Sequence, residues 1–289
     1  MEIKEEINLE DIFNKIKINL RIVIALPLAL TLITAIYSLS IPNTFKATVK
    51  YSVEDQFFSS SNTNSISSLL SISQSGPSII SVVEEVLYSR EFLSYIINDE
   101  YYKELIFAGR GKNDGNELYL DSNLIDLETR KWIEVPELRD IHEKFTRSIS
   151  FENSKDGIGE LSYIHESRKG AVEIVNKTFS SLNKFMSSRA KQSSQENINF
   201  LNDILKSVSE KNVQNSIAEL IKIETKELML ASKQQNYIFS SIQAAYEPYS
   251  RYQPKRSLIC LIAFFSTLSL VFFILIISQI FGIKLKYIK

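Results

Sequence analysis

Residues that could perform chemistry are scarce in this 289-residue chain, which has two histidines and one cysteine. His142 and His165 are 23 residues apart, and Cys260 lies in a long apolar run. A metal site needs three or four convergent ligands, and a catalytic centre needs a nucleophile beside a base. We interpret both histidines as surface or hydrogen-bonded side chains. The sequence therefore predicts no catalytic residue, no metal site and no cofactor site, and we expect the protein not to be an enzyme.

Other binding chemistries have little support in the residue pattern. No phosphate-binding G-x-x-x-x-G-K-[ST] motif occurs. The acidic residues are scattered along helical segments, without the carboxylate pair that glycan hydrolysis requires. Trp132 could touch a sugar ring, although a single aromatic side chain more often packs within a fold. Residues 42–256 carry 26 basic and 29 acidic side chains, so they present no positive field that would attract nucleic acid.

Two apolar runs bracket the chain. Residues 22–41 and residues 257–283 contain no charged side chain, and each run reaches the ~20 residues that a helix needs to cross a bilayer. A cleaved signal peptide is the alternative for the first run. That run is long for a signal peptide, and the 21 residues before it carry five acidic and four basic side chains. We therefore expect two transmembrane helices, short end segments at 1–21 and 284–289, and one exported domain at 42–256.

The exported domain has the patterns of an α+β fold. Residues 45–53 alternate between apolar and polar side chains, which predicts a half-buried strand. Residues 148–151 and 158–165 read as a hairpin, and residues 237–246 as a strand that returns beside the first one. A helical pattern follows Pro77, and residues 110–115 read as a surface turn. We expect a small mixed α/β base formed by 42–58, 77–170 and 236–250, with a loop at 59–75 that contains nine serines.

A very long helix is the second part of the predicted domain. Residues 171–247 contain neither glycine nor proline, and apolar side chains recur at helical spacing, which predicts a helix over about 171–235. A helix of ~65 residues would be on the order of 100 Å long, so its narrow apolar stripe needs partners along its length. We therefore predict a homo-oligomer. The alternative is a helical hairpin that folds back near the polar segment 187–197. The candidate interface residues are Leu201, Leu205, Ile217, Leu220 and Ile221.

The order of these parts resembles the chain-length determinant (Wzz-like) family of bacterial polysaccharide co-polymerases. Residues 9–13 (LEDIF) resemble the family's lead-in to its first span, and residues 88–93 (YSREFL) resemble one of its helical elements. Residues 162–176 (SYIHESRKGAVEIVN) look like its strand, turn and long-helix start, with Glu166-Ser167 in place of the usual Asp-Pro. The functional motif before the second span would comprise Pro248, Pro254, Lys255 and Arg256.

The resemblance implies a non-enzymatic regulator of surface polysaccharide chain length, for O-antigen or a related lipopolysaccharide glycan. It implies a ring or bell of identical subunits, with an octamer expected, beside an O-antigen-type polymerase and the nascent lipid-linked polysaccharide. It also implies a bacterial inner-membrane location with both termini cytoplasmic and the main domain periplasmic. Six residues follow the second run, so we expect the subclass without a kinase domain.

A different class of protein shares part of this pattern. A two-span membrane sensor or ligand-binding protein with a periplasmic domain would have the same two apolar runs and a helical exported part. Such a sensor would need a signalling domain inside the cell. The end segments of 21 and six residues are too short for one, so we expect chain-length regulation instead.

Overall fold

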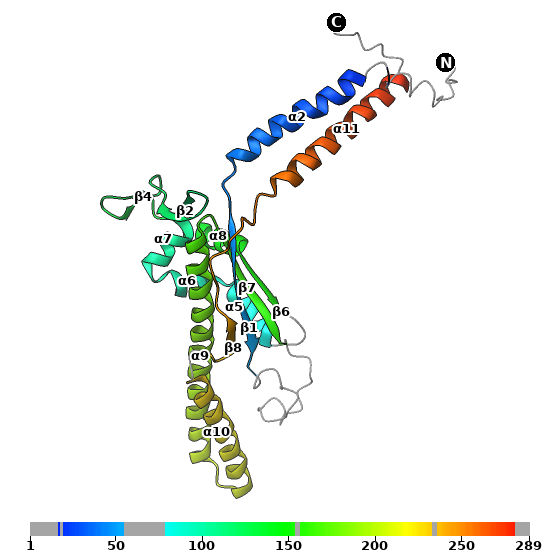
Figure 1. Cartoon of the computed structure of the whole chain (residues 1–289). Coiled ribbons are helices and arrows are strands. Elements are labelled where there is room, and N and C mark those ends of the chain that lie inside the picture. The colour runs from blue at the N-terminus through cyan, green and yellow to red at the C-terminus, as the bar shows by residue number, and fades with distance from the viewer. Residues whose placement is uncertain (1–16, 18–19, 55–78, 154–156, 233–235, 281–289) are drawn as a thin grey trace. The chain divides into compact units, whose positions relative to one another are not determined.

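The computed structural model describes residues 17, 20–54, 79–153, 157–232 and 236–280 (Figure 1). The chain divides into two compact units, one made of residues 1–43 and 252–289 and the other of residues 44–251. The predicted serine-rich loop at 59–75 lies outside the described residues.

The first unit contains two apolar helices, α2 (Leu20–Ser40) and α11 (Arg256–Ile280). Both are long and apolar enough to cross a membrane. They pack on each other through a small cluster of Val23, Val271 and Leu275, while most of their other large apolar side chains are exposed. Leucine and isoleucine that point outward from a helix are costly in water and suited to lipid.

A four-stranded antiparallel sheet forms the centre of the second unit. Its order is β6 (Ile149–Asn153), β7 (Ile158–His165), β1 (Phe45–Val53) and β8 (Phe239–Gln243). The predicted β6–β7 hairpin is confirmed by the antiparallel pairing of the two strands. The predicted return of the chain beside the first strand is also confirmed, because β8 pairs with β1.

One face of this sheet is buried. Along β1, every second residue is buried and the residues between them are half-buried or exposed, as the alternation in the sequence predicts. Tyr51 is fully buried, and its ring centroid lies 5.5 Å from that of Phe151 and 4.5 Å from that of Phe239. Aromatic side chains from β1, β6 and β8 therefore pack together in the core of this unit.

Short helices pack in the same core as the buried face of the sheet. They are α5 (Ile79–Leu87), α6 (Arg90–Ile97), α7 (Glu100–Ala108) and α8 (Leu138–Ser148). The helical pattern after Pro77 is thus broken between α5 and α6, where the Ser89 hydroxyl accepts a bond from the Phe92 backbone N–H and caps α6. Such a cap satisfies a donor that the helix itself leaves free.

Two small hairpins lie between α7 and α8. The first joins β2 (Gly109–Lys112) to β3 (Glu117–Leu120), and the second joins β4 (Ile125–Asp126) to β5 (Lys131–Trp132). The turn predicted at 110–115 is confirmed only in part, because residues 110–112 belong to β2 and the β2–β3 connection begins at Asn113. Its residues Asn113, Asp114 and Gly115 have φ values of 51°, 56° and 77°.

The very long helix is present, but it is shorter than predicted. Helix α9 (Arg168–Ser207) has 40 residues, and a turn at 208–210 leads into α10 (Lys211–Ala231), which packs against α9. The unbroken helix expected over 171–235 is therefore wrong. The chain folds back as a helical hairpin, at 208–210 instead of 187–197, and this fold-back buries Leu201 and Ile217 within one chain.

Candidate functional site

The residues predicted before the second span fall into the two different units. Pro248 belongs to the unit of residues 44–251, whereas Pro254, Lys255 and Arg256 belong to the helix pair. In the helix pair, the Arg256 guanidinium donates to the Asn43 side-chain oxygen at 3.1 Å and to the Ile41 carbonyl at 3.4 Å. Arg256 thus ties the start of α11 to the residues that follow α2.

Arg168 is the centre of the contacts around Pro248. One guanidinium nitrogen, Nη1, donates to the carbonyl oxygens of Pro248 at 2.9 Å and of Tyr249 at 3.0 Å. Its Nε donates to the Asp114 carbonyl at 3.2 Å, and Nη2 lies 3.5 Å from the Asp114 carboxylate. The guanidinium also lies over the Phe45 ring, 4.5 Å from its centroid. We call these five residues, with Arg168 at their centre, the Arg168 junction.

Local structure fixes the position of Arg168. Ser167 is the N-cap of α9, and its hydroxyl accepts a bond from the Gly170 backbone N–H. The Arg168 backbone N–H donates to the Gly115 carbonyl at 2.9 Å, which attaches the start of α9 to the β2–β3 turn. The junction therefore joins the start of α9, the start of β1, the β2–β3 turn and the segment at 248–249.

Sequence reasoning missed Arg168 as a site residue, although a signal was available. A positive charge in the first turn of a helix opposes the helix dipole. An arginine at that position is favourable only with compensating partners elsewhere, and those partners lie 54 and 80 residues away in the sequence.

His165 lies next to the junction and is buried. Burial, and next the positive charge of Lys144, lower the pKa of His165 to about 4, and its Nδ1 accepts a bond from the Ser167 N–H at 2.9 Å. A Cβ atom at Gly170 would lie 2.6 Å from that nitrogen, and one at Gly109 would lie 3.0 Å from Nε2. The ring is thus a neutral packing element enclosed by two glycines.

Neither histidine has the surroundings of a catalytic or metal-binding group. His142 donates through Nε2 to the Tyr88 carbonyl at 2.7 Å, so both histidines are hydrogen-bonded to backbone, as predicted. Across the described residues, no group of three or more histidine, cysteine, aspartate or glutamate side chains could hold a metal ion.

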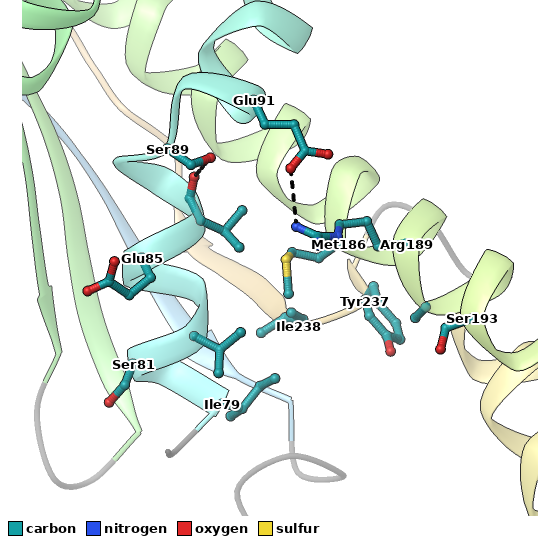
Figure 2. A pocket seen from close by; sticks show the side chains of 13 residues that line it. Ile79, Ser81, Glu85, Ser89, Glu91, Met186, Arg189, Ser193, Tyr237 and Ile238 are labelled. Carbon is teal, nitrogen blue, oxygen red and sulfur yellow. Dashed lines mark hydrogen bonds and ion pairs between the residues drawn. The ribbon is translucent and has the colours of Figure 1, made fainter. Parts of the chain in front are cut away.

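A shallow groove of about 850 Å³ lies between α5, α6 and α9. Figure 2 shows its apolar lining, including Ile79, Met186 and Ile238, and a charged pair beside them. That pair is Glu91 and Arg189, whose charged atoms are 3.6 Å apart. Among the described residues, the lining of this groove contains no histidine or cysteine, and its polar side chains include Ser81, Glu85 and Ser193.

The five predicted interface residues share the α9–α10 hairpin but differ in burial. Leu201 and Ile217 are buried within the single chain, while Leu205, Leu220 and Ile221 are half-buried. Part of the apolar stripe is therefore covered without a second copy. A role in assembly stays a prediction for the other three.

One protein-family model matches part of this chain, and several solved structures resemble it. The family model described as chain length determinant protein (Wzz) matches residues 5–100, which include the predicted family segments at 9–13 and 88–93. None of the curated proteins matches the chain. The solved structures it resembles include a full-length bacterial polysaccharide co-polymerase, at 12% identity and a TM-score of 0.36, with 98% of this chain and 100% of that chain covered. They also include a fragment of WzzB, a polysaccharide co-polymerase from Salmonella Typhimurium, at 15% identity and a TM-score of 0.29, with 73% of this chain and 100% of the fragment covered.

Proposed function

We propose that this chain, whose residues 5–100 match the chain length determinant family, regulates the chain length of a bacterial surface polysaccharide. It would act without making or breaking bonds, as a scaffold beside a membrane polymerase that extends a lipid-linked glycan such as O-antigen. The match over residues 5–100 is the observation that carries the proposal. The two apolar helices, which bracket a domain without a metal-binding cluster among its described residues, agree with it.

Deletion of the gene tests this function. Polymer synthesis should continue, but the favoured length should be replaced by a broad and mostly short distribution, because the polymerase would lack its regulator. Gel analysis of the glycan from the deletion strain measures the change, and the intact gene supplied in trans should restore the favoured length. Complete loss of polymer would contradict the proposal and indicate an enzyme or transporter. An unchanged ladder would leave the sensor or ligand-binding alternative.

The proposed location is the bacterial inner membrane, with both termini cytoplasmic and the 44–251 unit in the periplasm. A cysteine introduced at the exposed position Ser209 into a chain that carries Cys260→Ala tests the orientation. An impermeant thiol reagent should label it from the periplasmic side. A cysteine at position 284 should be labelled only after the inner membrane is opened, and the opposite pattern would contradict the orientation.

Assembly into a ring or bell of identical subunits, with eight copies expected, is part of the same proposal. The half-buried Leu205, Leu220 and Ile221 on the α9–α10 hairpin are the interface candidates that the fold-back leaves partly uncovered. Light scattering of the purified chain in detergent measures the subunit number. A monomer would contradict this part, and Leu220→Asp should reduce the mass of an oligomer because a charge at a buried contact is costly.

The Arg168 junction should position the segment that leads into α11. Arg168→Ala removes the donors for Pro248 and Tyr249, and each charge-assisted bond contributes roughly 1.5–3 kcal/mol. We expect a shifted or broadened glycan length at normal protein abundance. Arg168→Lys should restore part of the control, since one ammonium group cannot reproduce the guanidinium geometry.

The matched control for this variant is Arg147→Ala. Arg147 lies on α8, its side chain is 77% exposed, and its ion-pair partner among the described residues is Glu143, one helical turn away. It should leave the glycan ladder unchanged, as exposed ion pairs contribute ~0–1 kcal/mol. Equal ladders from Arg168→Ala and the wild type would show that the junction does not affect length control.

A further inference from the structure

The small hairpin formed by β4 and β5 exposes apolar side chains. Leu127, Ile133 and Val135 are 58%, 63% and 67% exposed, and they lie within eight residues of one another beside the short strands. Exposed apolar side chains that cluster, unlike single scattered ones, indicate an interaction surface. We call residues 121–137 the apolar hairpin.

The apolar hairpin is attached firmly at its base. Trp132 turns back toward α7, where its Nε1 donates to Glu100 at 2.5 Å and its ring centroid lies 6.1 Å from that of Phe107. Arg110 and Asp121 form an ion pair of 3.3 Å at the other side. Leu127, Ile133 and Val135 are therefore exposed on a hairpin that contacts with the rest of the unit hold in place.

Several polar groups of the hairpin are paired by local hydrogen bonds. The Asp126 carboxylate accepts bonds from the Glu128 N–H at 3.0 Å and from the Thr129 hydroxyl at 2.6 Å, and the Ile133 N–H donates to the Leu124 carbonyl at 3.0 Å. Because exposed backbone groups are costly in a lipid environment, these bonds make the tip suited to the interfacial layer of a bilayer.

The position of the hairpin within its unit suggests what covers it. Figure 1 shows β2 and β4 at the end of the 44–251 unit where β1 and α9 begin. That end carries both connections to the apolar helices, since β1 begins at Phe45, shortly after α2 ends at Ser40. The few residues between them extend at most ~3.3–3.6 Å each, so this end of the unit cannot lie far from a bilayer that α2 spans.

The charge of the hairpin indicates which lipid headgroups it would contact. Residues 121–137 carry five acidic and two basic side chains, which would be repelled by anionic headgroups. Headgroups with a positive ammonium group and no net charge, such as phosphatidylethanolamine, match both the acidic side chains and the apolar ones between them.

We propose that the apolar hairpin inserts Leu127, Ile133 and Val135 into the surface of the lipid bilayer as a third membrane contact, with a preference for lipids of no net charge. This inference depends on a membrane location for α2 and α11 but not on control of glycan length. The contact would add a third attachment of the 44–251 unit to the membrane, besides its chain connections to α2 and α11.

The single tryptophan of the chain, Trp132, lies in this hairpin and reports on the contact without a label. The full chain is reconstituted into phosphatidylethanolamine and phosphatidylcholine vesicles, and flotation with the vesicles verifies insertion separately. Lipids brominated near the headgroup should quench Trp132 emission more strongly than lipids brominated near the end of the acyl chain. Addition of anionic lipid should weaken this quenching.

The triple variant Leu127→Ser, Ile133→Ser, Val135→Ser keeps Trp132 and should lose most of the quenching. Phe200→Ser is the matched control, because Phe200 is 66% exposed and lies on α9 away from the hairpin. In this variant, brominated lipid should quench Trp132 emission as strongly as in the wild type. No quenching of the wild type in vesicles that float with the protein would overturn the inference. The inference would also be overturned if the triple variant kept the quenching of the wild type. It would be overturned as well if Trp132 emission changed with the protein-to-lipid ratio but not with bromine, because this would indicate that a second copy of the chain covers the apolar hairpin.

Discussion

The two halves of α9 are held in different ways. Of the 13 buried residues of this helix, 11 lie between Gly170 and Ser187, and only Ser194 and Leu201 lie beyond. The first half packs against the sheet and the short helices. The second half packs beside α10, in which Ile217 and Ala231 are buried, and its first turn also reaches α6 through the Arg189–Glu91 ion pair. We call the first half with the sheet the base, and the second half with α10 the tip.

The base and the tip should therefore differ in how cooperatively they unfold. Buried side chains contact many others, so the base should unfold as a unit, whereas a two-helix tip with few buried side chains can open without the rest. The structure thus combines a base with many buried side chains and a tip with few. Three pairs of variants sharpen or break this comparison.

The largest effect is expected at Asn183 in the base. Its side-chain nitrogen donates to the Phe239 carbonyl at 2.9 Å, and its oxygen accepts from the Ile238 and Phe239 N–H groups at 3.1 and 3.0 Å. Asn183→Ala leaves these buried groups without a partner, at a cost of roughly 1–3 kcal/mol each. Denaturant unfolding of the full chain in detergent should show a strongly reduced free energy of unfolding.

Asn197→Ala is the same substitution in the tip. The Asn197 side chain donates to Glu224 at 3.2 Å, but at an exposed position, so the change should stay within ~0.5 kcal/mol. If both variants lose the same stability, the base and the tip do not differ as described.

Acidification should weaken the base through His165. Its pKa is about 4 in the folded chain and 6.5 in the unfolded reference, so the unfolded state binds the proton first. The stabilisation from this group is complete above about pH 6.5 and is lost as the pH falls toward about 4. The loss amounts to roughly 3 kcal/mol at ~1.4 kcal/mol per pKa unit.

The pH dependence of the denaturation midpoint measures this effect. His165→Asn removes the titrating ring and should flatten the dependence between about pH 6.5 and about pH 4, even if it lowers stability at every pH. Asn197→Ala in the tip should keep the wild-type dependence. An unchanged pH dependence in His165→Asn would assign the acid sensitivity to other groups.

The sequence predicted the sheet better than the helices. Alternation of apolar and polar side chains at 45–53 located β1, and the turn residues at 153–157 located the β6–β7 hairpin, because both signals are local. The fold-back at 208–210 has no glycine or proline. It depends on the burial of Leu201 against another part of the chain, which a periodic pattern cannot distinguish from burial against a partner.

The junction illustrates the same limit. Pro248 and Arg256 could be selected from a motif, but Arg168 acquires its role only when the fold brings the β2–β3 turn and the 248–249 segment to the start of α9. Contacts that join residues so far apart in the sequence depend on the whole topology. A first-turn arginine indicates only that some partner exists.

The smallest effect on global stability is expected for Leu201→Ala in the tip. Leu201 is 9% exposed and Leu182 in the base is fully buried, and the same substitution at Leu182 should cost ~2–5 kcal/mol in global unfolding. Because the tip can open separately, Leu201→Ala should leave the global transition almost unchanged. It should instead lower the hydrogen-exchange protection of amides in α10, while amides of β1 and β7 keep theirs. Equal losses of protection in α10 and in the sheet would mean that the tip and the base unfold together, and that the long helix transmits stability along its whole length.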